Sequence, residues 1–175
     1  MKYKLVAFWL IVFGALFAFL QMCFEYHFYY IEQSQLFLFS EAYIRNKLLL
    51  PGGFSMLVAE FLVQFFIRPY VGALVTAALL TGVGVCTAGI VKRIAPVSGL
   101  FILYVLPILA LLFMHFDFNY RVQGTVCYLM MMALLCGYMR IRNDLFRLVA
   151  GCVLVPVLFW LAGSITVLFA GMVCL

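Results

Sequence analysis

Charged residues are scarce in this sequence. They account for 10% of the chain, whereas 69% of its 175 residues are hydrophobic and the mean hydropathy is +1.22. Soluble domains carry roughly 25% charged residues, and a single core of a chain this long could not bury so much apolar surface. A soluble fold is therefore excluded. In a bilayer, lipid solvates the outer faces of helices, so the composition predicts an integral membrane protein.

The motifs of soluble enzymes are also missing. The sequence contains no P-loop, no dinucleotide-binding glycine pattern, no H-E-x-x-H and no G-x-S-x-G. Its six cysteines lie in or at the end of apolar runs and show no C-x-x-C or metal-ligand spacing, as is typical of small buried side chains. His27, His115 and Asp117 are expected on one side of the membrane, but the sequence does not bring them together. We therefore predict no metal site.

A formal net charge of +5 would suggest a nucleic-acid partner in a soluble protein. Here the basic residues flank apolar runs, and no basic and aromatic groove module is present. Lipid head groups and membrane topology account for them better. We expect a lipid bilayer as partner and no nucleic acid.

Apolar runs of spanning length predict five transmembrane helices, at residues 5–22, 70–91, 97–115, 122–139 and 148–170. The first run could be a signal peptide, but no A-x-A-like site follows it, so we interpret it as an uncleaved helix. Ala73, Ala77 and Thr81 recur at four-residue intervals in the second run, which predicts a closely packed helix.

The basic residues also predict an orientation. An N-terminus in the cytoplasm places seven of the eleven basic residues inside, on short connections: Lys2, Lys4, Lys92, Arg93, Arg140, Arg142 and Arg147. The expected location is the inner cell membrane. No polar tail follows the fifth run, so we expect the sequence to be the N-terminal part of a longer chain. Other membrane helices or that missing part are its expected partners.

Polar residues concentrate in residues 23–69, which this orientation places outside as one long loop. Glu41 precedes Arg45 by four positions, the spacing of a helical ion pair. Pro51-Gly52-Gly53 interrupts the loop, and residues 54–67 are apolar enough to form an interfacial helix. If the first helix continues beyond the bilayer, Gln21, Glu25, Glu32 and Gln35 share one face. The predicted fold is an all-α polytopic bundle of about five spans, with interfacial helices in the outer loop.

A resemblance follows from the order of four segments between about Lys4 and Arg93. They are Glu32-Gln33-Ser34-Gln35-Leu36-Phe37, Leu50-Pro51-Gly52-Gly53-Phe54, Glu60 to Phe66, and Arg68-Pro69-Tyr70-Val71-Gly72-Ala73-Leu74. This order resembles the first portion of the GT-C superfamily of membrane glycosyltransferases, which use lipid-linked sugar donors. Glu32-Gln33 replaces the acidic pair common in that loop, and Pro51-Gly52-Gly53 replaces the usual proline pair. Two of these phrases, Glu32-Gln33-Ser34-Gln35-Leu36-Phe37 and Pro51-Gly52-Gly53, also resemble a family of uncharacterised bacterial polytopic membrane proteins.

The GT-C resemblance implies a membrane glycosyltransferase, or a fragment of one, in which the catalytic residue Glu32 would activate an acceptor or help to hold a metal. Gln33 and Gln35 would bind substrate beside it, and Arg45, Lys47 or Arg68 would meet the lipid phosphate. The alternative is a non-catalytic membrane subunit, scaffold or transporter fragment whose loop binds a partner. A transporter should carry ionisable residues inside its spans. These spans have none, unless the helix that carries Glu60 is inserted.

Overall fold

The computed structural model describes residues 2–94 and 101–174. Every regular element in those residues is helical, and there is no strand among them. The helices are α1 (Lys2–Cys23), α2 (Glu25–Ser34), α3 (Glu41–Leu48), α4 (Gly53–Val63), α5 (Val71–Ile94), α6 (Phe101–Met114), α7 (Val122–Tyr138), α8 (Asp144–Ala162) and α9 (Thr166–Cys174). Two 3₁₀ turns, Gln64–Ile67 and Gly163–Ile165, follow α4 and α8. The all-α class is thereby confirmed.

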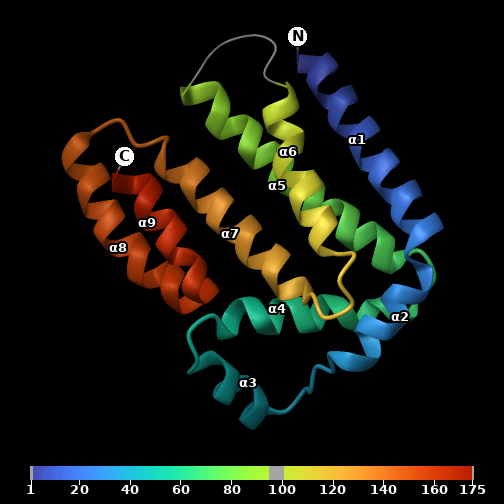
Figure 1. Ribbon diagram of the computed structural model, residues 1–175. Helices are drawn as coiled ribbons and strands as arrows, with labels where there is room; N and C mark the ends of the chain where they lie inside the picture. Colours follow the sequence, from blue (N-terminus) through green and yellow to red (C-terminus); the bar gives the residue numbers. More distant parts are fainter. Residues whose placement is uncertain (1, 95–100, 175) are drawn as a thin grey trace.

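The long helices form a bundle that is closed at one end by a helix lying across it (Figure 1). α5 packs against α1, α6 and α7, and α7 packs against α4, α8 and α9. α4 lies across the end at which α1 stops and α7 starts, with α3 beyond it (Figure 1). We call this the α4 end. The N-terminus, the C-terminus and the α7–α8 connection lie at the opposite end (Figure 1).

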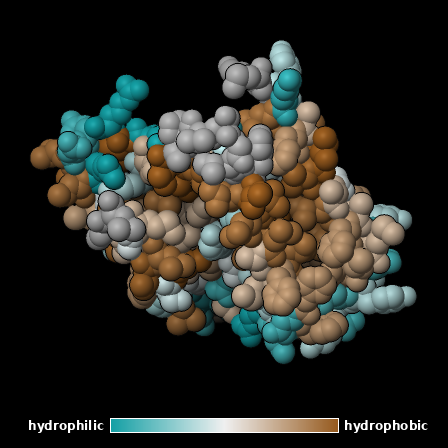
Figure 2. All heavy atoms as spheres, turned by 45° about the horizontal axis from the view of Figure 1, so that its top comes forward, coloured by the Kyte–Doolittle hydropathy of each residue, from teal (hydrophilic) through white to brown (hydrophobic). Residues whose placement is uncertain are grey.

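Several helices are apolar enough for a membrane. By length and composition the candidates to cross one are Tyr3–Cys23, Val71–Ile94 and the stretch Asp144–Val173. Figure 2 shows hydrophobic residues over the centre of one face and hydrophilic residues around its margin. α6 and α7 are 14 and 17 residues long, shorter than the roughly 20 residues that cross the hydrocarbon core. Five spans therefore remain a prediction, and the start of the third, residues 97–100, lies outside the described residues.

The predicted single helix over residues 148–170 is wrong. α8 ends at Ala162, and Gly163 has a φ of 70°, a positive value that glycine adopts without steric cost. α9 then folds back beside α8, so that a Cβ built on Gly151 would lie 3.1 Å from Cγ1 of Val173. The uniform hydrophobicity of the run concealed a helical hairpin.

The first helix does not continue into the loop. Phe24, with φ of −124° and ψ of 13°, separates α1 from α2, and α2 ends at Ser34. Phe24 is buried, with its ring centroid 5.0 Å from that of Phe116. Gln21 and Gln35 therefore do not belong to one continuous helix, and the shared polar face expected for such a helix does not form.

The small residues of α5 allow close packing, as predicted. Ala73 and Ala77 are fully buried. A Cβ on Gly84 would lie 2.5 Å from Cδ1 of Ile108 in α6 and 2.7 Å from Cζ3 of Trp9 in α1. Helices approach closely where side chains are this small. The close packing is confirmed, and the partner helices belong to this same chain.

Candidate functional site

A partly buried ion pair joins α3 to α4. Lys47 Nζ lies 3.0 Å from Oε1 of Glu60, and no other ion pair within 4.0 Å occurs in residues 2–94 and 101–174. Glu60 is only 7% exposed. Tyr43 donates a hydrogen bond of 2.5 Å to the other carboxylate oxygen, and Lys47 also donates to Sδ of Met56 at 3.1 Å. Both oxygens of the buried carboxylate are thus satisfied, as burial of a charge requires.

Helical spacing creates this contact. Tyr43 and Lys47 are four residues apart on α3, and Met56 and Glu60 are four apart on α4. Residues four apart lie on one face of a helix, so two such faces meet when the helices fold together. Burial, followed by the hydrogen bond to Glu60 and its negative charge, raises the pKa of Tyr43 to about 12. Its phenol therefore stays protonated and remains a donor.

The turn Pro51-Gly52-Gly53 holds α3 and α4 in place. Gly52 has a φ of 75°, and a Cβ on it would lie 3.2 Å from the backbone nitrogen of Gly163. The Gly52 amide donates to the carbonyl of Trp160 at 2.9 Å, and Nε1 of Trp160 donates to the carbonyl of Leu48 at 2.9 Å. The motif therefore lets the α3–α4 turn meet the turn between α8 and α9 backbone to backbone.

A cavity of about 230 Å³ lies beside the ion pair, and we call it the Glu60 cavity. Around Glu60 it is lined by Ser34, Gln35, Tyr43, Lys47, Arg121 and Gln123. The side chains of Gln35 and Arg121 make no hydrogen bond or ion pair with any other described residue. Two cations, one carboxylate and the free amide of Gln35 thus surround this space.

The structure brings some of the predicted site residues together and separates others. Gln35 and Lys47 line the Glu60 cavity. Glu32 does not line it: this residue is partly exposed on α2, and its side chain has no partner among the described residues. Gln33 is exposed beside it. Arg45 faces a different groove, against Trp160.

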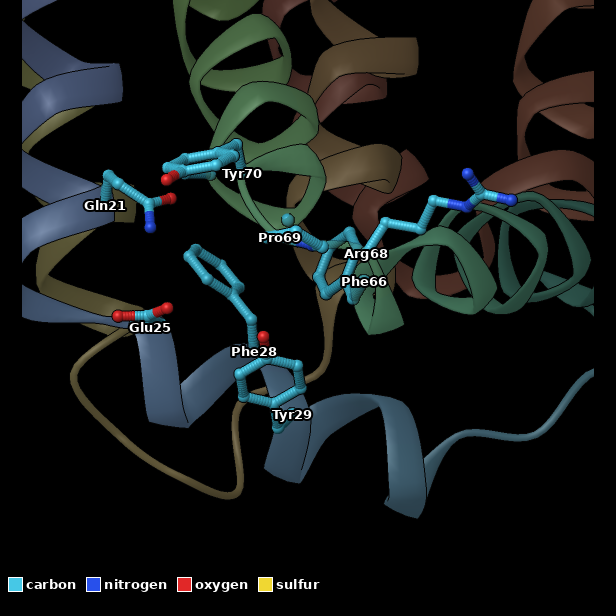
Figure 3. Close-up of a pocket in the computed structure, with 10 residues that line it drawn as sticks. Gln21, Glu25, Phe28, Tyr29, Phe66, Arg68, Pro69 and Tyr70 are labelled. Atoms are coloured by element: carbon cyan, nitrogen blue, oxygen red, sulfur yellow. The ribbon is translucent and has the colours of Figure 1, made fainter.

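Arg68 lies at a third place. It borders a cavity of about 10 Å³ between α1, α2 and the start of α5. Figure 3 shows its guanidinium extending away from that cavity, while Gln21 and Tyr70 face each other above Phe28. The space is too small for a substrate. Arg45, Lys47 and Arg68 therefore do not form a single phosphate site.

The predicted ion pair between Glu41 and Arg45 is wrong. Both side chains are exposed, and they do not approach within 4.0 Å of each other. An exposed pair gains little because water and salt screen it. Lys47, two residues further on, forms the pair instead because it faces α4.

Sequence reasoning did not assign five polar residues of the Glu60 cavity to the site: Tyr43, Glu60, Arg121, Gln123 and Ser34. A signal existed for the first two, since Tyr43/Lys47 and Met56/Glu60 are matched four-residue spacings on either side of a tight turn. No local sequence pattern indicated Arg121 or Gln123. They reach the cavity only because α7 starts at the α4 end of the bundle.

The two histidines lie apart from this cavity. His115 is buried, and its Nε2 lies 3.0 Å from Oγ1 of Thr125. His27 packs on Phe118, with ring centroids 4.8 Å apart, and burial lowers its pKa. Within residues 2–94 and 101–174, no group of three or more His, Cys, Asp or Glu side chains could hold a metal ion. The Glu60 cavity is the best candidate site.

Its chemistry suits a polar ligand that carries a negative charge. Lys47 and Arg121 together exceed Glu60 by one positive charge. Arginine and lysine are the usual partners of phosphate and carboxylate groups. The amides of Gln35 and Gln123 and the carboxylate of Glu60 can exchange hydrogen bonds with hydroxyl groups.

Comparison with known proteins supplies no activity. No curated protein matches the chain, and no solved structure matches it. A sequence model of DUF6057, described as a family of unknown function, matches residues 1–175. The chain belongs to that family.

Proposed function

We propose that this protein is an integral membrane protein that binds a lipid-linked sugar at its α4 end, as a GT-C-like glycosyltransferase does. The Glu60 cavity carries the proposal. Its guanidinium and ammonium groups suit a phosphate, and its amides and carboxylate suit sugar hydroxyls. Pockets for drug-sized ligands measure about 300–1,000 Å³, so 230 Å³ suits a smaller group such as one sugar ring.

The distribution of charge supports a membrane orientation with the Glu60 cavity outside. Four basic residues lie toward the α4 end: Arg45, Lys47, Arg68 and Arg121. The other basic residues lie toward the opposite end of the bundle, near the start of α1, the end of α5 and the α7–α8 connection (Figure 1). There Arg93 donates from Nη1 to the carbonyl of Met139 at 2.5 Å, joining the ends of α5 and α7. The richer basic end is the one expected in the cytoplasm.

The roles of the two acids differ in this proposal. Glu60 is held by Lys47 and Tyr43, so it fixes the position of the Lys47 ammonium beside the cavity. Glu32 is the acid that the GT-C resemblance implies, and its side chain makes no hydrogen bond or ion pair with another described residue. A carboxylate without a structural partner is the better candidate for a general base.

The test is sugar transfer from a polyprenyl-phosphate-linked donor, measured in membranes that contain the full-length protein. Lys47→Met should lower donor binding, and Glu32→Gln should lower the transfer rate. Arg45→Gln, on the groove beside Trp160, is the matched control and should leave both unchanged. Donor binding that is equally tight in Lys47→Met and wild type would refute the proposal.

One observation favours a non-catalytic subunit or scaffold instead. Lys47, Glu60 and Tyr43 satisfy one another without any ligand, as a purely structural network would. In that case no lipid-linked sugar should bind to the wild type.

A further inference from the structure

Arg121 borders two hollows of opposite character. On one side lies the polar Glu60 cavity. On the other lies a groove of about 620 Å³ between the α3–α4 turn, the start of α7 and the α8–α9 turn. We call it the α9 groove. Arg121 and Gln123 line both, so the two hollows meet at these side chains.

Much of the lining of the α9 groove is apolar. It includes Cys127 of α7, Ala162 at the end of α8, Ile165 in the turn and Leu168 of α9, with Ser164 and Tyr120 as polar neighbours. Leu168 is 54% exposed on one of the most hydrophobic stretches of the chain. In a bilayer this side of the groove opens toward hydrocarbon.

Arg121 itself is available for a ligand. It is exposed, and its side chain makes no hydrogen bond or ion pair with another described residue. Its backbone is fixed, because the carbonyl of Arg121 accepts a 3.0 Å hydrogen bond from the amide of Gly124 at the start of α7. The guanidinium fork that extends from this fixed backbone matches the geometry of phosphate oxygens.

The polar Glu60 cavity, the free guanidinium of Arg121 and the α9 groove thus lie next to one another in that order. A head group, a phosphate and a hydrocarbon chain follow one another in the same order in a lipid-linked sugar. We infer that Arg121 binds the phosphate of a long single-chain alkyl or polyprenyl phosphate, whose chain lies in the α9 groove. The head group then enters the Glu60 cavity. This inference rests on the proposed function and assigns the phosphate to a residue outside the loop of residues 23–69.

The experiment uses a polyprenyl monophosphate without sugar, added to the purified full-length protein in detergent, with binding followed by native mass spectrometry. Arg121→Gln should raise the Kd at least about tenfold, the effect of losing one hydrogen bond to a charged group. Arg68→Gln is the matched control, since that guanidinium points away from its cavity (Figure 3). Its Kd should stay within about threefold of wild type.

Two further variants complete the test. Arg121→Lys keeps the charge and loses the fork, so its Kd should lie between those of wild type and Arg121→Gln. Leu168→Trp narrows the α9 groove and should weaken polyprenyl phosphate while leaving butyl phosphate unchanged. Equal losses in Arg121→Gln and Arg68→Gln would overturn the inference. So would equally tight binding of dimyristoyl phosphatidylglycerol, which would indicate bulk lipid.

The outcomes separate this inference from the proposal it extends. If a sugar-linked donor binds through Lys47 while Arg121→Gln changes nothing, the assignment of the phosphate fails and the proposed function stands. If no lipid phosphate binds with or without sugar, both fail.

Discussion

Gly53 starts α4 directly against the backbone of Lys47, so a Cβ on Gly53 would overlap the carbonyl oxygen of Lys47. The absence of one side chain therefore lets α3 and α4 fold together and brings Lys47 opposite Glu60. The Glu60 cavity depends on this turn as much as on its polar residues.

Gly53→Ala should consequently destabilise the protein. The clash is with backbone, which cannot rotate away, and overpacking of this kind costs about 1–3 kcal/mol. Thermal unfolding in detergent, followed by circular dichroism, measures the loss. Gly14→Ala is the control: it lies within α1 with open space around its Cβ position, so it should be neutral or slightly stabilising. Equal melting temperatures for the two variants would contradict the turn geometry.

Lys47→Met should destabilise the fold by about 3 kcal/mol, because it leaves the carboxylate of Glu60 buried without its cation. The low end of the range for buried pairs applies, since the Lys47 side chain is 19% exposed. Adding Glu60→Gln to Lys47→Met removes the unpaired charge and should restore part of the loss. A double variant no more stable than Lys47→Met would show that the charge of Glu60 is not the cause.

Stability at high pH should depend on Tyr43. Its pKa is raised to about 12 in the folded protein, above the ordinary value of 10. A raised pKa stabilises the fold below pH 10, and that contribution is lost as the pH rises from 10 toward 12. Wild type should therefore lose stability relative to Tyr43→Phe across this window. Parallel melting curves of the two proteins from pH 8 to 11 would contradict the shielded position of Tyr43.

The sequence predicted the fold class well because hydrophobic runs and helix length determine it locally. α5 is the clearest case: the spacing of Ala73 and Ala77 predicted close packing without knowledge of its partners. The α8–α9 hairpin escaped prediction because Gly163 lies in a run as apolar as its neighbours. The need for a glycine at this position becomes clear only from its contact with the backbone of Gly52, which is distant in the sequence.

The candidate site was predicted only in part. Lys47 and Gln35 belong to a polar loop that the composition marks clearly. The four-residue spacing in the sequence favours an ion pair between Glu41 and Arg45, yet Lys47 faces α4 and forms the ion pair with Glu60. Arg121 enters the site from the connection between α6 and α7, and no local pattern could place it there. Contacts between segments distant in the sequence decided these outcomes.

The predicted topology can be tested with reporter fusions. Arg45 should lie outside and Asn143 inside, because the basic residues divide between the two ends of the bundle. Alkaline phosphatase should be active after Arg45 and inactive after Asn143, and a fluorescent-protein reporter should show the reverse. A cytoplasmic signal after Arg45 would exclude an outer site for the Glu60 cavity.

Glu32 offers the sharpest test of catalysis. Glu32→Gln keeps the size of the side chain and removes its charge, and this side chain has no described partner to lose. Expression and membrane insertion should therefore stay near normal. If Glu32 is the general base, sugar transfer by the full-length protein should fall at least about 100-fold, the low end for such a group. Glu41→Gln, also without a described side-chain partner on the neighbouring helix α3, is the control and should retain activity. An active Glu32→Gln beside an inactive Glu41→Gln would identify the other acid, and full activity of both would favour a scaffold.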